Sequence, residues 1–358
     1  MIDSGHRRAL VPFLRGPAAF SHMSPATQTA NPGQIPAIAA EAGTHGHALH
    51  APRAGATATF IHDLRELFKV KVVGMVLVTG WGGFYLGSLA SGVSTMQPGL
   101  INALINALVG IGLVSAGAGA LNQVLERSSD ARMIRTADRP LASGRFPLWV
   151  GLAAGMAALA LGSWWLLMHT NLLTVSLALL TAFTYVAIYT PLKRVTTLAT
   201  FIGAFPGAMG PLLGWTAARP QIDWQAVALF GILFVWQFPH FMSIAWLYRD
   251  DYARAGIRRL PVVQPDGWST VVEAVFYAVL MIPVSLAPWR LGMTSTSYAW
   301  IAAALGLVYL GYTLRFAQIL KARSEDESRK LARDLLKISV LYLPLLFTAL
   351  MICAVAKR

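Results

Sequence analysis

Residues 120–141 read ALNQVLERSSDARMIRTADRPL, and they follow an apolar run, residues 72–119, that contains no charged residue. An uncharged apolar segment of this length is typical of membrane-spanning helices. The abrupt return of acidic and basic residues marks a membrane edge. We therefore expect an all-α membrane protein in which residues 120–141 form a charged region at one face of the bilayer.

Three oxygen-bearing side chains recur at intervals of four in this stretch: Asn122, Glu126 and Asp130. On an α-helix such residues share one face and lie about 6 Å apart along the axis. Mg²⁺ binds through a few carboxylates together with the oxygens of a bound phosphate, and arginines neutralise the remaining phosphate charge. The alternative is a solvated helix end with ordinary pairs between residues four apart. Spacing alone leaves both interpretations open.

The composition is that of a membrane protein. Hydrophobic residues make up 56% of the 358 residues and charged residues only 13%, with 11 Trp and 31 Gly. This apolar share exceeds that of ordinary soluble domains. The formal charge of +13 is explained by basic loops beside the membrane, so no nucleic-acid partner is predicted.

Nine apolar runs have the roughly 20 residues needed to span a bilayer. They cover residues 70–90, 99–119, 147–168, 171–190, 197–216, 225–247, 269–288, 298–318 and 336–355. The gaps between them are loops, so residues 65–358 form one transmembrane domain. Residues 1–60 are rich in Pro, Ala, Gly and Ser without an apolar period, and we expect a disordered tail there.

The basic residues predict the orientation. If the N-terminus is inside, all but four of the 29 Lys and Arg residues fall on the inner side, the exceptions being Arg219, Arg290, Lys357 and Arg358. By the positive-inside rule the N-terminus and residues 120–141 face the interior. We expect a multi-pass protein of the bacterial cytoplasmic membrane. The mitochondrial inner membrane is the alternative, because the arginines near the N-terminus also suit a transit peptide.

A second acidic cluster, Asp250 and Asp251, follows the sixth apolar run. Like residues 120–141, it stands at the inner end of an even-numbered span. Two acidic clusters facing one another across a bundle could each hold Mg²⁺ on one diphosphate. The predicted metal ligands are therefore Asn122, Glu126, Asp130, Asp250 and Asp251.

Three other features leave alternatives open. His240 is the only histidine within a predicted span, and it suits either a substrate contact or a hydrogen bond to a neighbouring helix. The aromatic residues around it suit an interface belt, or an apolar pocket for a polyprenyl chain or a flat macrocycle. Glycines and prolines in residues 203–214 allow either close helix approach or an opened backbone beside a cavity.

Four segments together resemble the intramembrane UbiA-type prenyltransferases, most closely their haem-prenylating branch, the protohaem IX farnesyltransferases or haem O synthases. They are NQVLERSSDARMIRTADRPL (122–141), YTPLKR (189–194), GAFPGAMGPLLGW (203–215) and FPHFMSIAWLYRDDYARAGIRRLPVV (238–263). The most discriminating feature is the Asn122, Glu126 and Asp130 series followed by Met-x-Arg-Thr-x-x-Arg-Pro. Quinone-making relatives usually carry Asp in place of Glu126. The resemblance extends from about residue 65 to the end of the chain.

This resemblance implies a nine-transmembrane-helix bundle, Mg²⁺ as cofactor, farnesyl diphosphate as donor and haem b as acceptor, with haem O as product. It assigns Asn122, Glu126, Asp130 and Asp251 to catalysis. It assigns diphosphate binding to Arg135, Arg139, Lys193 and Arg249, and we expect His240, Tyr248 and Tyr252 to line the substrate pocket. An enzyme downstream in the haem pathway is the expected protein partner.

The chain departs from the family pattern at two places. Phe68-Lys69-Val70-Lys71 replaces the usual Thr-Lys-Pro, and Arg258-Arg259 replaces a proline and an apolar residue. Neither change removes a proposed ligand. The alternatives are a prenyltransferase acting on a quinone precursor or a chlorophyll-type ring and, from another class, a multispan transporter.

Overall fold

The computed structural model describes residues 56–93 and 97–355, which belong to a unit spanning Ala54–Arg358. The predicted disordered tail, residues 1–60, lies outside the described residues as far as residue 55. Helix α1 (Ala56–Leu67) begins directly after that point.

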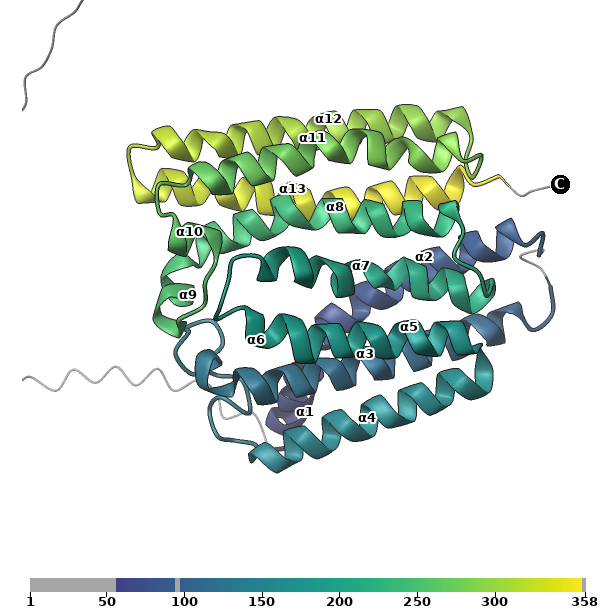
Figure 1. The fold of residues 1–358 in the computed structure, drawn as a ribbon, viewed down its shortest axis with the longest axis horizontal. Helices are drawn as coiled ribbons and strands as arrows, with labels where there is room; N and C mark the ends of the chain where they lie inside the picture. Colours follow the sequence, from purple (N-terminus) through teal and green to yellow (C-terminus); the bar gives the residue numbers. More distant parts are fainter. Residues whose placement is uncertain (1–55, 94–96, 356–358) are drawn as a thin grey trace, which may run out of the picture. The chain divides into compact units, whose positions relative to one another are not determined.

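Long helices dominate this unit (Figure 1). In chain order the helices after α1 are α2 (Val70–Ala90), α3 (Leu100–Asp130), α4 (Leu148–His169), α5 (Leu172–Phe183), the π-helix η1 (Thr184–Tyr189), α6 (Thr190–Leu192), α7 (Ala199–Ala218), α8 (Trp224–Leu247), α9 (Arg249–Ala255), α10 (Leu260–Val263), α11 (Trp268–Arg290), α12 (Thr296–Phe316), the 3₁₀-helix η2 (Ala317–Lys321) and α13 (Glu325–Ile352).

Each of the nine predicted spans corresponds to a long helix in the described part of the chain: α2, α3, α4, α5 continued through η1 and α6, α7, α8, α11, α12 and α13. Within those residues, eight of the nine are long and apolar enough to cross a membrane. Helix α7 is the exception, because its glycines and prolines dilute its apolar content. The fold is the predicted all-α membrane bundle.

Helix α7 packs on α2 with almost no side chain between them. A Cβ atom added at Gly214 would lie 1.8 Å from the carbonyl oxygen of Gly80, and one at Gly83 would lie 2.0 Å from that of Pro211. The helix continues from Ala199 to Ala218 although Pro206 and Pro211 lie inside it. Small residues let two membrane helices approach closely, so Gly80, Gly83 and Gly214 serve close packing here.

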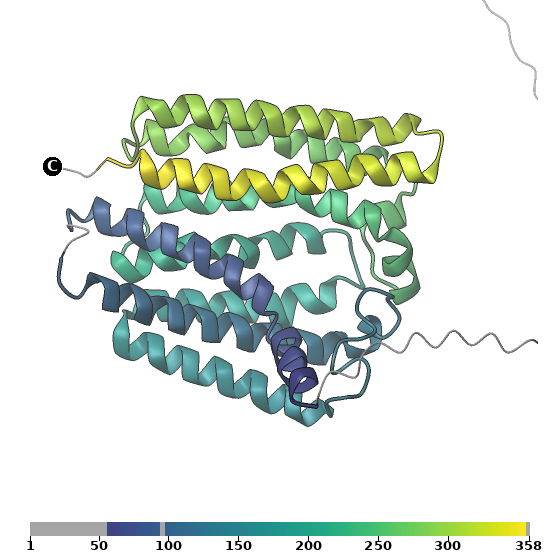
Figure 2. The ribbon, with the colours of Figure 1, turned by 180° about the vertical axis from the view of Figure 1, so that it is seen from behind.

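The charged segments of the chain lie together at one end of the bundle. Helix α3 packs on α4, α8 on α7 and α11, and α13 on α8 and α12. The connection from α3 to α4 lies at the same end as α9 and α10, as both views show (Figures 1 and 2). This end gathers the charged segments that the sequence singles out.

The outward-facing side chains of the long helices are strongly apolar. Trp149, Leu172, Phe276 and Trp300 are 69%, 69%, 60% and 75% exposed. A water-facing helix would carry polar side chains at such positions. Apolar helices with apolar outer faces identify a multi-pass membrane protein.

Candidate active site

Asn122, Glu126 and Asp130 lie on the buried face of the last turns of α3, with exposed fractions of 0%, 8% and 1%. Helix α3 includes all three residues and ends at Asp130. The shared face predicted from their spacing is therefore confirmed. Their burial excludes the alternative of a merely solvated helix end.

Each of these three side chains holds a cationic partner from another segment. Lys193 Nζ lies 2.6 Å from Glu126 Oε1, and Arg139 Nη1 lies 2.8 Å from Asp130 Oδ2. Lys69 Nζ donates a hydrogen bond to Asn122 Oδ1. Three cationic side chains therefore contact the oxygens for which the sequence predicts metal and diphosphate binding.

The second acidic segment packs against the loop that follows α3. Asp251 in α9 accepts the backbone N–H groups of Ile134 at 3.3 Å and Arg135 at 3.4 Å, and it pairs with Arg254. Arg132 Nη2 donates to the carbonyl oxygen of Ala255 at 2.9 Å. The two acidic segments therefore meet at one end of the bundle, as their positions on even-numbered spans predict.

Arg135 joins the two predicted tyrosines to the polar junction, where the loop that follows α3 meets α9. Its guanidinium carbon lies 4.6 Å from the ring centre of Tyr248, and its Nη2 donates to the Tyr252 hydroxyl at 3.3 Å. A guanidinium held on aromatic faces is desolvated but keeps free N–H groups. Arg135, Tyr248 and Tyr252 thus lie beside Asp251.

Two predicted residues turn away from this junction. Asp250, whose side chain is 61% exposed, pairs with Arg329 of α13 at 3.1 Å. Arg249 pairs with Glu325, also on α13. Successive residues of a helix point about 100° apart, so Asp250 and Asp251 serve different neighbours. The structure does not bring Asp250 or Arg249 to the α3 stripe, which is the buried face of α3 formed by Asn122, Glu126 and Asp130.

His240 also faces α13. Its Nδ1 lies 2.8 Å from Ser339 Oγ, and its ring stacks on Trp236 with 4.9 Å between ring centres. These contacts match the alternative of a hydrogen bond between helices. The contact of His240 with substrate stays a prediction.

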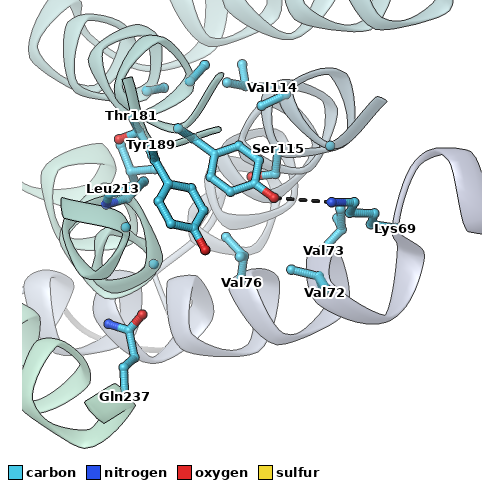
Figure 3. Close-up of a pocket in the computed structure, with 18 of the residues that line it drawn as sticks. Lys69, Val72, Val73, Val76, Val114, Ser115, Thr181, Tyr189, Leu213 and Gln237 are labelled. Carbon is cyan, nitrogen blue, oxygen red and sulfur yellow. Dashed lines mark hydrogen bonds between the residues drawn. The ribbon is translucent and has the colours of Figure 1, made fainter. Parts of the chain in front are cut away.

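A cavity of about 300 Å³ lies between the helices, and Lys69, which bonds Asn122, is part of its lining (Figure 3). Its walls come from α2, α3, α5, α7 and α8, and include Val72, Val76, Val114, Ala182, Pro206 and Leu213. Largely apolar clefts of a few hundred Å³ with a few polar groups are typical of small-molecule sites. The shape suits an apolar chain that carries a charged head.

The polar end of the cavity is shared with the α3 stripe. Lys69 and two tyrosines line it, and Lys69 Nζ donates to the Tyr185 hydroxyl at 3.2 Å (Figure 3). The rings of Tyr185 and Tyr189 stack with 5.6 Å between centres. Both lie on the π-helix η1, and short π-helical segments inside α-helices often occur at functional sites. Lys69 therefore connects the cavity directly to Asn122.

Two further cations surround Tyr189. Lys193 Nζ lies 4.3 Å from its ring centre, and Arg259 Nη2 donates to its hydroxyl at 3.0 Å. Burial alone would lower the pKa of Lys193, but Tyr189 and Glu126 outweigh it and raise that pKa above its ordinary value. Burial alone would also lower the pKa of Arg259, but Tyr189 and Tyr252 outweigh burial and raise that pKa. Both groups stay positively charged at neutral pH, which suits an anionic ligand.

Sequence reasoning missed four residues of this site: Lys69, Tyr185, Arg259 and Gln237. Lys69 and Arg259 were noticed only as departures from a family pattern. Tyr185 stands four residues before Tyr189, a spacing that places both on one helix face. Gln237 is an uncharged polar residue inside an apolar span, and such a residue needs a hydrogen-bonding partner.

The α3 stripe has the chemistry of an incomplete Mg²⁺ site. Nowhere in residues 56–93 and 97–355 do three His, Cys, Asp or Glu side chains gather as a metal cluster. The stripe offers two carboxylates and one amide, and Asp130 Oδ1 is buried without a hydrogen-bond partner in that same part of the chain. Mg²⁺ commonly takes one or two carboxylates and completes its shell with substrate phosphates and water. The donor set fits Mg²⁺ bound together with a diphosphate.

Comparison with known proteins shows to which family the chain belongs. The model of the UbiA prenyltransferase family matches residues 74–353. This chain belongs to the UbiA prenyltransferase family. It is therefore a prenyltransferase embedded in a membrane, as the resemblance implied.

Individual UbiA family members resemble the chain over nearly their whole length. A protoheme IX farnesyltransferase of Koribacter versatilis is 48% identical over 304 residues, which are 85% of this chain and 96% of the relative. The structure of a digeranylgeranylglyceryl phosphate synthase superposes with a TM-score of 0.63 at 18% identity, covering 82% of this chain and 98% of that one. A UbiA homologue from Archaeoglobus fulgidus, bound to GPP and Mg²⁺, superposes with a TM-score of 0.52 at 14% identity, covering 80% and 99%. The two structures share the fold.

Proposed function

We propose that this UbiA family member transfers the farnesyl group of farnesyl diphosphate to a vinyl group of haem b, giving haem O. The name and 48% identity of the Koribacter versatilis relative support the substrate pair. The observation that carries the proposal is that the cations paired with the α3 side chains reach the lining of an apolar cavity: Lys69 lines it and bonds Asn122, and Lys193 joins Glu126 to the cavity-lining Tyr189. A charged head and an apolar chain would fit such a site together.

The chemistry begins with loss of the diphosphate. Breaking the allylic C–O bond develops negative charge on the leaving group, and preorganised cations stabilise that charge. Lys193, Arg135 and Arg139 would donate to the departing diphosphate, with Lys69 at the rim of the cavity. In the free protein Lys193 and Arg139 are paired with Glu126 and Asp130, so they would turn to the diphosphate once Mg²⁺ neutralises these carboxylates.

Asn122, Glu126, Asp130 and Asp251 would hold Mg²⁺ together with the diphosphate oxygens. Bound Mg²⁺ would supply Lewis-acid stabilisation of the leaving group. The A. fulgidus UbiA homologue bound to GPP and Mg²⁺ supports this assignment. Asp250 and Arg249 are not carried into the proposal, since both face α13.

The apolar cavity protects the cation that is left behind. Bulk water would quench an allylic cation at once, so the reaction needs a site from which water is largely excluded. The stacked rings of Tyr185 and Tyr189 lie where the polar and apolar parts meet. Their electron-rich faces would stabilise positive charge there.

The site would open on the cytoplasmic side of a bacterial membrane, with the N-terminus inside. The loops at the site end carry most of the basic residues, as the positive-inside rule requires. The K. versatilis relative is bacterial, which supports a bacterial membrane over the mitochondrial inner membrane.

The test is a product assay on membranes containing the chain. Incubation with haem b, farnesyl diphosphate and Mg²⁺ should yield haem O, detected by liquid chromatography and mass spectrometry. Prenylation of hydroxybenzoate in place of haem b under competition would instead support a quinone precursor as acceptor. The absence of any haem O would reject the proposal.

A pair of adjacent substitutions tests the site. Asp251→Asn should lower turnover by at least about 100-fold, the scale of losing one transition-state electrostatic contact. Asp250→Asn, its neighbour on the exposed side of α9, should leave turnover within about threefold, because surface ion pairs contribute little. Equal losses from both variants would contradict the assignment of Asp251.

A further inference from the structure

Gln237 of α8 is a buried amide that faces the cavity. Only 3% of the residue is exposed, yet it lines the cavity (Figure 3). Among the described residues that line the cavity, it is the one carboxamide. A buried amide in an apolar span calls for an account of each of its hydrogen-bonding atoms.

The nitrogen of this amide is fully used. Gln237 Nε2 donates to the carbonyl oxygen of Ala204 at 3.1 Å and to that of Leu233 at 3.0 Å. Two carbonyl acceptors require an NH₂ group at this position, so they determine which way the amide is turned. These two hydrogen bonds hold the side chain between α7 and α8.

The oxygen of the amide is left as an acceptor. Among the described residues, no donor is paired with Gln237 Oε1. Glycine at position 207 leaves room for the oxygen itself, which packs against that glycine: a Cβ atom there would lie only 2.0 Å from Gln237 Oε1. Glycine at position 207 thus keeps a fixed, unpaired carbonyl oxygen at the cavity wall.

The level of this oxygen relates it to the reaction. Tyr189 lies against Gly203, where an added Cβ would meet its ring at 2.4 Å, and Gln237 lies against Gly207. Four residues of α7 separate the two glycines, so Gln237 stands about 6 Å deeper than Tyr189. A vinyl group of haem b bound at this level would lie just below the departing diphosphate.

We propose that Gln237 Oε1 holds the water molecule that is added to the farnesylated vinyl group. This inference rests on the proposed function. The C1–O bond of farnesyl diphosphate breaks and its electron pair leaves with the diphosphate. The vinyl π electrons form the bond from C1 to the terminal vinyl carbon, and positive charge moves to the vinyl carbon next to the ring.

Water held by Gln237 closes the sequence. Its oxygen lone pair bonds to the positively charged carbon, and the proton that the water loses passes to the released diphosphate. The net reaction consumes one water molecule and gives the hydroxyethylfarnesyl group and protonated diphosphate. Gln237 itself neither gains nor loses a proton.

An amide is suited to this position for two reasons. Its carbonyl oxygen orients a water by accepting one O–H, leaving a lone pair of the water for attack. A carboxylate in the same place would combine with the carbon cation, and an apolar residue would leave the water without a partner. The neutral, oriented acceptor avoids both outcomes.

The test measures how the cation is partitioned. Without positioned water the cation loses a proton instead, and the product is lighter than haem O by one water. In Gln237→Leu we expect the ratio of haem O to this dehydrated product to fall about tenfold, the scale of one hydrogen bond. Mass spectrometry measures both products from the same reaction, so lower yields of folded protein do not change the ratio.

A second variant removes the interaction with Gln237 still present. Gly207→Ala should displace the amide oxygen and shift the ratio in the same direction. Gln225→Leu is the matched control, because Gln225 is the same residue type on the same helix, about three turns from Gln237, and does not line the cavity. It should leave the ratio unchanged.

The outcomes separate this inference from the proposed function. If the wild-type chain makes no haem O, the proposed function fails. If it makes haem O but Gln237→Leu and Gly207→Ala keep the wild-type ratio, the role of Gln237 is overturned. In water enriched in oxygen-18, haem O should gain one labelled oxygen, and an unlabelled product would likewise overturn it.

Discussion

The ion pair between Lys193 and Glu126 gives the sharpest prediction about the site. Lys193→Met should destabilise the protein because it leaves the Glu126 carboxylate without its partner. The two side chains are only 10% and 11% exposed, and the charged atoms lie 2.6 Å apart. A carboxylate buried to this degree cannot recover its hydration when the partner is lost.

The expected magnitude follows from this burial. Breaking a buried ion pair by removing one partner costs about 3–5 kcal/mol, whereas replacing both partners by neutral groups is often nearly neutral. An unfolding entropy of about 2 cal/mol/K per residue gives about 1.5 °C of melting temperature per kcal/mol for a unit of this size. Lys193→Met should therefore lower the melting temperature by about 5 °C or more. The double variant Lys193→Met with Glu126→Gln should recover most of this loss.

The assay is thermal unfolding of the purified protein in detergent without substrate, followed by circular dichroism. Lys330→Met is the matched control, since Lys330 lies exposed on α13 at the same end of the bundle. It should change the free energy of unfolding by less than about 0.5 kcal/mol. The reasoning is refuted if Lys193→Met unfolds at the wild-type temperature, or if the double variant is less stable than Lys193→Met.

Three further predictions concern pH, packing and metal. A hydrogen bond from Arg145 is the main cause that lowers the pKa of Asp63. This pair therefore stabilises fully above the ordinary aspartate pKa of about 4, and the stabilisation is lost progressively as the pH falls toward the lowered pKa of the folded protein. Asp63→Asn should lower the melting temperature more at pH 7 than near pH 3. Gly214→Ala should destabilise by about 1–3 kcal/mol or more in denaturant titrations, since its Cβ would meet the Gly80 carbonyl oxygen at 1.8 Å, whereas Gly74→Ala has open space around it and should not. Chelation with EDTA should abolish haem O formation, and Mg²⁺ should restore it; activity that survives chelation would contradict the metal assignment.

The sequence was sufficient for the fold because the fold depends on long, repeated signals. Apolar runs of about 20 residues predict membrane helices whatever their detailed packing, and all nine runs became long helices. The helical spacing of Asn122, Glu126 and Asp130 likewise needed only the geometry of one helix. Local periodicity was therefore a reliable guide to local structure.

The site was predicted less completely because it depends on contacts between distant segments. Sequence gave no way to choose between Asp250 and Asp251, which point about 100° apart on α9. Lys69 reaches Asn122 only because α1 and α2 pack beside α3. The role of Gln237 depends on its contact with Gly207, from which it is separated in the chain by the second half of α7, a loop and the first half of α8. Such pairings are properties of the bundle, not of any one helix.

Two buried ion pairs of the α3 stripe couple the binding of the two ligands of the proposed reaction, diphosphate and metal. Glu126 is neutralised by Lys193, and Asp130 by Arg139, so neither basic residue can turn to a diphosphate without leaving a buried carboxylate unpaired. A divalent cation on the carboxylates removes that penalty and frees both basic residues for the diphosphate. Binding of diphosphate and of metal must then strengthen one another, and by linkage the effect is equal in both directions. The ion pairs of the free protein thus explain why the allylic bond would be broken only when both ligands are present.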